Sequence, residues 1–223
     1  MKANYYDDKL NSEKLFKVYD TNIPRAKQYL DEEIKYVKNR LTGSENVLEL
    51  GAGYGRIIKE LAPKCASITG IDISKGNVEL GLEYLKDFPR ANMMVMDVHN
   101  MNLDEEFDVV LCLQNGLSAM KANLDTIKSI MDLVKPGGKG YFSSYSENFW
   151  DIRLEWFQEQ ADKGLLGEID TENTKDGVIV CKDGFRGITH SEEDFQKIGE
   201  ELGFQFEIEE VDESSLFLIV SKE

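Results

Sequence analysis

A short glycine-rich segment after an apolar run constrains the fold of this chain more than any other feature. The apolar run 47–50 leads directly into Gly51, Gly53 and Gly55, and apolar residues then recur at helical spacing over 56–62. Glycine has no Cβ, so the backbone can adopt positive φ and a ligand can approach the bare amide groups. The segment therefore predicts a strand that turns sharply into a helix, which is a shape that binds nucleotides.

An acidic residue ends the next apolar run. Asp72 directly follows the run 68–71, which is the first apolar run after the glycine-rich turn and its helix. In an open parallel sheet, an acid at the tip of the second strand is placed to accept the hydroxyl groups of a ribose. The turn and the acid together are a more specific signal than either feature alone.

The glycine spacing bears on which ligand this turn binds. A dinucleotide fingerprint reads Gly-x-Gly-x-x-Gly, and its third small residue lets the helix and strand pack closely. In this chain the third position after Gly53 is Arg56, and the spacing is Gly-x-Gly-x-Gly instead. These residues leave both a dinucleotide and an S-adenosyl ligand open, and the spacing favours the S-adenosyl ligand.

Five segments of the chain resemble motifs of the class I S-adenosylmethionine-dependent methyltransferase family. The first motif of that family is similar to segment 49–55, and its second-strand acid matches Asp72. Segment 94–98 looks like its third strand with an adenine-binding acid, segment 107–113 like its fourth strand, and segment 134–138 like the turn before its fifth strand. The five motifs occur in the order of the family.

We expect an α/β fold. From residue 46 to about 144, apolar strands alternate with helical patterns, which predicts a parallel sheet with its ligand at the carboxyl ends of the strands. Two later strand-like runs, 204–208 and 216–220, are close enough in sequence to pair antiparallel. The resemblance implies the same architecture, a doubly wound, mostly parallel seven-stranded sheet of Rossmann-like methyltransferase fold with an antiparallel C-terminal hairpin.

The chain is long enough for one sizeable core, so we expect a single methyltransferase domain over 1–223. Its predicted parts are an N-terminal helical lid 1–43, a cofactor-binding core 46–144, an inserted substrate cap 145–190, and a closing helix and strand hairpin 191–223. The cap is inferred because this segment is too long for a plain connection and leaves the sheet at the ligand-binding edge. The alternative is a decoration of the outer surface.

Periodicity predicts several individual elements. Apolar residues at steps of three or four predict an amphipathic helix over 26–41 that Gly43 ends, and another helix that buries Leu82 on its apolar face. Inside the cap, segment 147–163 has aromatic residues at helical spacing, and segment 178–185 is typical of a hairpin with a tight turn.

The resemblance implies how the cofactor, S-adenosylmethionine with S-adenosylhomocysteine as product, is bound. Glu49 and the glycine turn shape the site for the amino-acid end, Asp72 binds the ribose, and Asp97 and the amide of Val98 contact the adenine. Arg25 is similar to an arginine that pairs with the cofactor carboxylate in small-molecule N-methyltransferases of the glycine N-methyltransferase type, and the alternative is a solvated first-turn helix residue. The predicted cofactor residues are Tyr19, Arg25, Glu49, Gly51, Ala52, Gly53, Gly55, Arg56, Asp72, Ile73, Asp97, Val98, Leu113, Gln114 and Asn115.

Three residues are candidates for a catalytic role. Gln114 and Asn115 end the fourth strand beside the expected methyl group, and His99 is either a general base or a solvated loop histidine. The aromatic residues after the fifth strand either form a cage for a methylated amine or fill a small core. The candidates for the substrate pocket are Tyr145, Phe149, Trp150 and Arg153.

Composition limits the partners of the protein. With 42 acidic residues against 26 Lys and Arg the net charge is −16, which repels the phosphate backbone of nucleic acids. No apolar run approaches the roughly 20 residues that span a membrane, and the N-terminus lacks the apolar core of a signal peptide. Three widely spaced cysteines indicate neither a disulfide framework nor a metal site, so we expect a cytoplasmic protein whose cysteines are buried.

These features together predict an S-adenosylmethionine-dependent methyltransferase. The acceptor would be a small molecule, with nitrogen slightly favoured over oxygen, and the methyl group would move by in-line displacement. A non-catalytic S-adenosylmethionine-binding regulator whose cap closes on a protein partner is an alternative. A nicotinamide-dependent oxidoreductase is a weaker one, because Arg56 and the terminal hairpin argue against it. Neither the acceptor nor the oligomeric state follows from the sequence.

Overall fold

The computed structural model of the protein describes residue 5 and residues 13–223. Residues 1–4 and 6–12, which belong to the predicted lid, lie outside the described part of the chain. No helix in the described part is long and apolar enough to cross a membrane.

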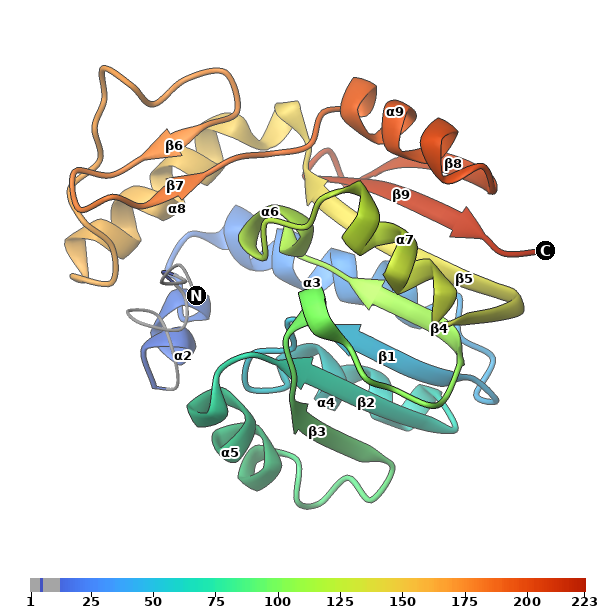
Figure 1. The fold of residues 1–223 in the computed structure, drawn as a ribbon. Helices are drawn as coiled ribbons and strands as arrows, with labels where there is room; N and C mark the ends of the chain where they lie inside the picture. Colours follow the sequence, from blue (N-terminus) through green and yellow to red (C-terminus); the bar gives the residue numbers. More distant parts are fainter. Residues whose placement is uncertain (1–4, 6–12) are drawn as a thin grey trace.

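One seven-stranded sheet organises the chain (Figure 1). Its strand order is β3-β2-β1-β4-β5-β9-β8, in which the first five strands are parallel and β9 runs antiparallel to both β5 and β8. This arrangement confirms the predicted doubly wound sheet with its C-terminal hairpin. The strands are β1 (Asn46–Leu50), β2 (Ser67–Asp72), β3 (Ala91–Val95), β4 (Phe107–Cys112), β5 (Val134–Tyr145), β8 (Gln205–Val211) and β9 (Ser215–Ser221).

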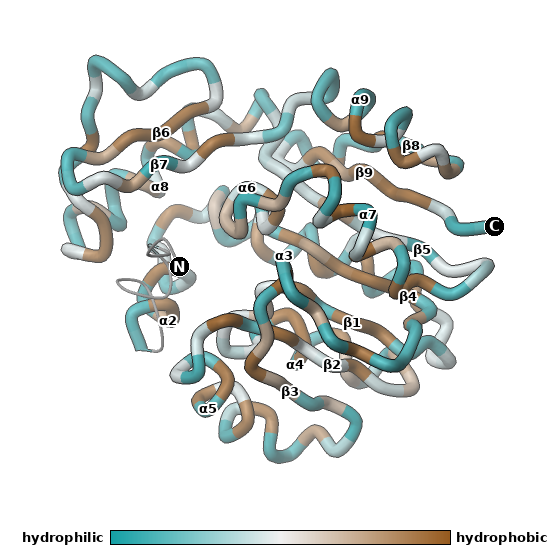
Figure 2. Tube along the Cα trace, viewed as in Figure 1, coloured by the Kyte–Doolittle hydropathy of each residue, from teal (hydrophilic) through white to brown (hydrophobic). Residues whose placement is uncertain are grey.

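Helices cover both faces of the sheet because its apolar strand residues alternate between two cores. Val47 belongs to one buried cluster and its neighbour Leu48 to the other, and Val109 and Val110 divide in the same way. Figure 2 shows the resulting hydrophobic interior along the strands, with more hydrophilic residues on the outer helices. One face is covered by α3 (Pro24–Lys38), α4 (Arg56–Leu61) and α5 (Lys75–Tyr84), and the other by α6 (Gly116–Ala119), α7 (Leu124–Asp132) and α9 (Glu192–Leu202).

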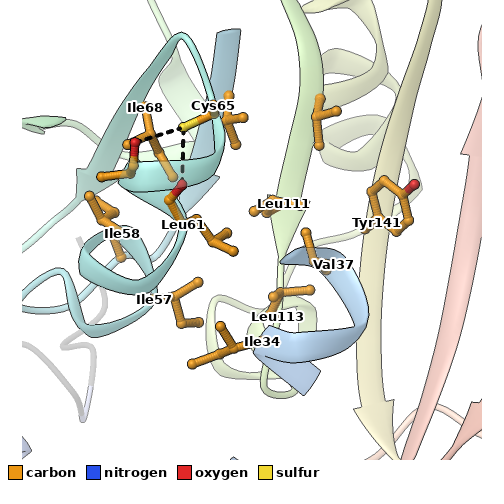
Figure 3. Packing of buried hydrophobic residues seen from close by; sticks show 14 of the residues in the cluster. Ile34, Val37, Ile57, Ile58, Leu61, Cys65, Ile68, Leu111, Leu113 and Tyr141 are labelled. Carbon is orange, nitrogen blue, oxygen red and sulfur yellow. Dashed lines mark hydrogen bonds between the residues drawn. The ribbon is translucent and has the colours of Figure 1, made fainter. Parts of the chain in front are cut away.

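Figure 3 shows part of the first core. Ile34 and Val37 of α3 lie against the sheet near Leu111, and α4 packs beside them. The short 3₁₀ turn η1 (Ala62–Lys64) follows α4, and the chain then turns back toward β2. There the Cys65 thiol donates to the carbonyl of Leu61 over 3.4 Å. All three cysteines are buried and free, as their spacing predicted.

Some local predictions were wrong. The helix α3 ends at Lys38, well before Gly43, because the chain there tightens into a turn in which the amide of Arg40 bonds to the carbonyl of Val37. On α5, Leu82 is 47% exposed, since Gly81 rather than Leu82 is the position that packs against Met93.

The turn predicted before the fifth strand lies inside β5. The pairing of β5 with β4 shifts register between the pairs Phe107–Val134 and Val109–Lys139, so the intervening residues bulge out of the ladder. The bulge contains the proline and glycines that indicated a turn.

Segment 145–190 forms structure of its own, with a helix and a hairpin where the sequence predicted them. It contains the short turn η3 (Glu147–Phe149), helix α8 (Trp150–Asp162) and the two-stranded sheet of β6 (Ile179–Val180) and β7 (Arg186–Gly187). Figure 1 shows α8 and this small sheet beyond the end of the main sheet toward which β1, β2 and β4 point, close to α2 (Glu13–Tyr19).

A comparison of two leucines tests the assigned cores. Leu61→Ala removes a side chain with no exposure and should lower the free energy of unfolding by about 2–5 kcal/mol, because it leaves a cavity between α4 and the sheet. The matched control is Leu82→Ala on α5, which should change it by less than about 0.5 kcal/mol. Urea unfolding followed by circular dichroism measures both, and equal losses would contradict the orientation of α5.

Candidate active site

A cavity of about 420 Å³ lies at the carboxyl ends of the central strands. Residues after β1, β2 and β4 line one part of it, and residues of α2 and of segment 145–190 line the rest. The strand order reverses direction between β1 and β4, and open α/β sheets bind ligands at such a reversal. The cavity therefore occupies the position that the fold makes available for a ligand.

The glycine turn has the backbone conformation that its sequence predicted. Gly51 and Gly53 have φ values of +66° and +56°, in the region that favours glycine. The amide of Gly53 donates to Oδ2 of Asp72 over 2.8 Å. The turn after β1 and the end of β2 are thus joined directly at the floor of the cavity.

Asp72 is held by several donors in addition to Gly53. Its Oδ1 accepts from the amide of Ser74 over 2.9 Å and from Nδ2 of Asn77 over 3.1 Å. Ser74 is the N-cap of α5, so the start of that helix is fixed to the same carboxylate. These bonds hold the Asp72 carboxylate in one orientation at the cavity wall.

A buried carboxyl group and a guanidinium line the cavity near the turn. Glu49 is only 3% exposed and its Oε2 has no hydrogen-bond partner among the described residues. Burial raises the pKa of Glu49 to about 8, although the nearby Arg56 opposes this shift. Within the described part of the chain, Nε and Nη2 of Arg56 are also buried without partners, and its guanidinium lies 4.7 Å from the centroid of the Tyr19 ring. A ligand that carries both a positive and a negative group would satisfy these atoms.

The chain makes a strained turn at the end of β4. Gln114 and Asn115 have φ values of +53° and +60°, which cost energy for residues with a side chain. The amide of Gln114 is fixed by two acceptors, Oε2 of Glu33 at 3.0 Å and Oγ of Ser143 at 2.8 Å. Glu33 is fully buried, and burial raises its pKa to about 7. The turn places the Gln114 side chain at the cavity.

Asn115 instead connects the turn to the end of segment 145–190. Its Nδ2 donates to the carbonyl of Ile188 over 2.8 Å, and its Oδ1 accepts from Oγ of Ser144 over 3.0 Å. The same Ser144 hydroxyl accepts from the amide of His190. The Asn115 side chain therefore holds the turn after β4 against Ser144 and Ile188. It does not line the cavity, whereas the next residue, Gly116, does.

His99 lines the cavity, but both of its ring nitrogens have partners. Nε2 lies 2.8 Å from the carbonyl oxygen of Met120, and Nδ1 lies 3.0 Å from Oγ1 of Thr126. Its amide donates to Oδ1 of Asp97, which caps the 3₁₀ turn η2 (Val98–Asn100). These contacts fix the loop after β3 and leave His99 poorly placed to accept a proton from a substrate.

The structure brings most of the predicted site residues to one cavity. Besides His99, the predicted residues that line it are Tyr19, Glu49, Gly51, Ala52, Gly53, Arg56, Asp72, Ile73, Asp97, Val98, Leu113, Gln114 and Tyr145. The predicted residues that lie outside the described lining are Arg25, Gly55, Asn115, Phe149, Trp150 and Arg153.

Several of the predicted residues that do not line the cavity have partners elsewhere in the structure. Nη1 of Arg25 contacts Oδ2 of Asp212 at 2.6 Å, which ties α3 to the turn between β8 and β9. Gly55 is the N-cap of α4, where a Cβ would meet Leu85. Arg153 is 1% exposed and donates to two carbonyl groups of segment 145–190.

The sequence reasoning missed much of the wall opposite the glycine turn. The helix α8 was predicted from its aromatic residues, whereas its buried face consists of Arg153, Trp156, Phe157 and Gln160, and the pattern did not reveal which of them line the cavity. The spacing of one helical turn between Trp156 and Gln160 was an available signal. The missed residues that line this wall are Leu15, Val18, Trp156, Phe157, Gln160, Leu166 and Phe185.

Known proteins match the core of the chain. A family model described as a methyltransferase domain matches residues 47–138. A ubiquinone biosynthesis O-methyltransferase of Coxiella burnetii is 29% identical over 119 residues, which cover 52% of this chain and 50% of the relative. A protein of the same name from Aromatoleum aromaticum is 30% identical over 119 residues, covering 50% and 49%. The chain thus spans about half the length of the curated relatives it matches.

Solved structures of low sequence identity share the fold. A SAM-dependent methyltransferase from Methanosarcina mazei has a TM-score of 0.61 at 20% identity, covering 84% of this chain and 96% of that one. The N-methyltransferase NodS from Bradyrhizobium japonicum, in complex with S-adenosyl-L-homocysteine, has a TM-score of 0.56 at 15% identity, covering 99% of both chains. Segment 47–138 of this chain is thus similar to a methyltransferase domain, and the solved structures share its fold.

Proposed function

We propose that the protein transfers the methyl group of S-adenosylmethionine to a small-molecule acceptor. The observation that carries this proposal is the fixed carboxylate of Asp72 beside the glycine turn, in a cavity that also holds the partnerless polar atoms of Glu49 and Arg56. A nucleoside with an attached amino acid has hydroxyl groups for Asp72 and opposite charges for the other two residues. The residues present therefore fit this cofactor.

Each end of the cofactor has candidate partners. Arg56 would bind the carboxylate of the amino-acid end and Glu49 its positive charge, while Gly51 and Gly53 allow the ligand to approach the backbone. Asp72 would accept from the ribose hydroxyls. The adenine would lie beside Ile73, Asp97 and Val98, which line the cavity after β2 and β3. Tyr19, Ala52, Leu113 and Gln114 complete the proposed cofactor site.

The rate of this reaction depends mainly on how the methyl donor and the acceptor are placed relative to each other. When bound, the cofactor would supply a methyl group on a positively charged sulfur. The acceptor lone pair would form the new bond, the sulfur would keep the electron pair of the broken S–C bond, and the acceptor would release its proton to water. Holding the two reactants in line contributes roughly 7–11 kcal/mol to such a reaction. The chain would supply this through the strained Gln114 turn on one side and segment 145–190 on the other. Because the methyl group is already activated by the positive charge on sulfur, no acid or base among the lining residues is needed to activate the methyl donor.

The related proteins and the charge support a small acceptor. The curated relatives are named as O-methyltransferases of ubiquinone biosynthesis, and NodS is named as an N-methyltransferase. A net charge of −16 argues against a nucleic-acid substrate. We also infer a cytoplasmic protein, which the three free cysteines support. In this proposal α2 belongs to a lid and segment 145–190 is a cap over the acceptor.

A non-catalytic cofactor-binding protein is a second candidate. The structure titled as the [4+2]-cyclase SpnF has a TM-score of 0.65 at 15% identity and covers 92% of this chain, so the fold also occurs in a protein that is not named as a methyltransferase. Incubation with S-adenosylmethionine and a metabolite extract, followed by mass spectrometry, separates the two candidates. Appearance of S-adenosylhomocysteine together with a methylated metabolite supports methyl transfer, whereas binding without turnover supports the second candidate.

Asp72→Asn should weaken S-adenosylhomocysteine binding by about 10- to 100-fold, because hydrogen bonds to a charged group contribute roughly 1.5–3 kcal/mol. Isothermal titration measures the affinity. The matched control is Asp108→Asn, since Asp108 also accepts from a backbone amide and pairs with Lys135, yet it does not line the cavity. The control should bind the ligand as the native protein does. A folded Asp72→Asn protein with native affinity would contradict the proposed ribose site.

Raising the pH from about 6 to about 8 should strengthen S-adenosylhomocysteine binding. Burial gives Glu49 a pKa of about 8 in the ligand-free protein, so it is protonated at pH 6, and a bound ammonium group favours the ionised form. Binding then releases a proton, and affinity rises by at most about tenfold per pH unit until the pKa is passed.

The variant Glu49→Gln should bind with little dependence on pH in this range. Titrations in buffers of different ionisation enthalpy measure the proton released on binding, which should be present in the native protein and lost in the variant. Equal proton release by both proteins would show that another group titrates.

A further inference from the structure

The cavity wall opposite the glycine turn differs in chemistry from the rest of the cavity. Helix α8 and its surroundings supply this acceptor wall, and α2 adds Leu15 and Val18 beside it. Aromatic side chains predominate, and all members are buried. The acceptor wall consists of Tyr145, Trp156, Phe157, Gln160, Leu166 and Phe185.

The ionisable residues of the described lining belong to the other side. The Asp, Glu, Lys and Arg residues of this lining are Glu49, Arg56, Asp72, Asp97 and Lys121, and all of them come from strands of the main sheet or from the segments that follow them. The acceptor wall contributes one ionisable residue, Tyr145, and burial raises its pKa to about 12, so it is neutral. A charged group placed against this wall would lose its hydration and meet no charged side chain of the described lining. The Arg153 guanidinium lies outside that lining and already donates to the carbonyls of Gly177 and Gly187.

A buried cation behind the acceptor wall also bears on the charge of the acceptor. The guanidinium of Arg153 lies 4.4 Å from the centroid of the Tyr145 ring and 5.3 Å from that of Phe157. It already interacts with these two rings from outside the cavity lining. A second cation on the cavity side would be repelled, which argues against the aromatic cage for a methylated amine that the sequence left open.

The aromatic residues of the wall suit a planar ring. Trp156 and Phe157 meet edge to face, with centroids 6.1 Å apart and an interplanar angle of 77°, and Phe157 lies 5.8 Å from Phe185. Rings that already pack in this way offer further edges and faces to a ligand ring. Gln160, which is buried in the same wall, has a carboxamide that can orient one polar group of the ligand.

We propose that the methyl acceptor is an uncharged molecule with an aromatic ring, which binds against the wall formed by Tyr145, Trp156, Phe157, Gln160, Leu166 and Phe185. This inference rests on the proposed function and names the class of its acceptor. The group that receives the methyl would be a neutral hydroxyl or amine on or near the ring. Charged acceptors of the same shape are excluded by the absence of charge on this wall within the described lining.

Three naphthyl compounds that differ in charge test the proposal. The native protein is saturated with S-adenosylhomocysteine and titrated calorimetrically with 2-naphthol, with 2-naphthoate and with 2-naphthylmethylammonium. 2-Naphthol should bind at least about tenfold more tightly than either ion, because only the ions lose hydration without compensation. An ion that binds as tightly as 2-naphthol overturns the proposal, and so does a protein that binds none of the three.

A pair of substitutions on α8 locates the binding. Phe157→Leu keeps most of the side-chain volume but removes the ring, and should weaken 2-naphthol binding by about 2- to 10-fold. Trp150→Leu, which removes an aromatic residue of the same helix outside the described lining, should leave it unchanged. Equal effects of both substitutions, or none from Phe157→Leu, overturn the assigned wall.

The affinity for S-adenosylhomocysteine is measured on every sample. It should stay within about twofold of the native value in both variants, which shows that they are folded. Native protein that binds S-adenosylhomocysteine but fails the naphthyl test refutes the acceptor class alone. Native protein that does not bind S-adenosylhomocysteine refutes the proposed function itself.

Discussion

The hydrogen bond from the Gly53 amide to the Asp72 carboxylate is the interaction on which the candidate site depends. It joins the turn after β1 to the end of β2, and the bonds from Ser74 and Asn77 extend this unit to the start of α5. Glycine is favoured at the turn because φ of Gly53 is +56°, which strains a residue with a side chain, and a Cβ there would also lie 2.8 Å from Leu15 of α2. The floor of the cavity is thus set by backbone geometry and one carboxylate.

The N-terminal segment and segment 145–190 form a second unit on the opposite side of the cavity. Nε1 of Trp156 donates to the carbonyl of Val18 over 3.2 Å, and Oε1 of Glu159 accepts from the amide of Asn22 over 2.9 Å. Residues of α2, α3 and α8 share one hydrophobic cluster. Because these contacts connect the proposed lid to the proposed cap, a movement of one would displace the other. The proposed lid and the proposed cap therefore form one structural unit.

The sequence was most informative where local signals determine the structure. Three alternating glycines and an acid at a strand end predicted the part of the cavity around the glycine turn, and the alternation of apolar strands with helical patterns predicted the sheet. It was least informative where a side chain finds a distant partner. Nothing in the local pattern shows that Arg25 pairs with Asp212 or that Arg153 reaches Gly177, so both were assigned to the site. The face of α8 that lines the cavity likewise depends on packing against the N-terminal segment.

The two walls of the cavity come from different parts of the chain. The charged lining residues, from Glu49 to Lys121, all lie within the segment 47–138 that matches the methyltransferase family model. The uncharged aromatic wall lies in segment 145–190, outside that match. Fold neighbours named as an N-methyltransferase and as a cyclase indicate that this sheet accommodates different reactions. In the proposed function the polar groups of segment 47–138 bind the donor and the aromatic wall selects the acceptor, so a change in segment 145–190 would alter the acceptor without any change in the donor site.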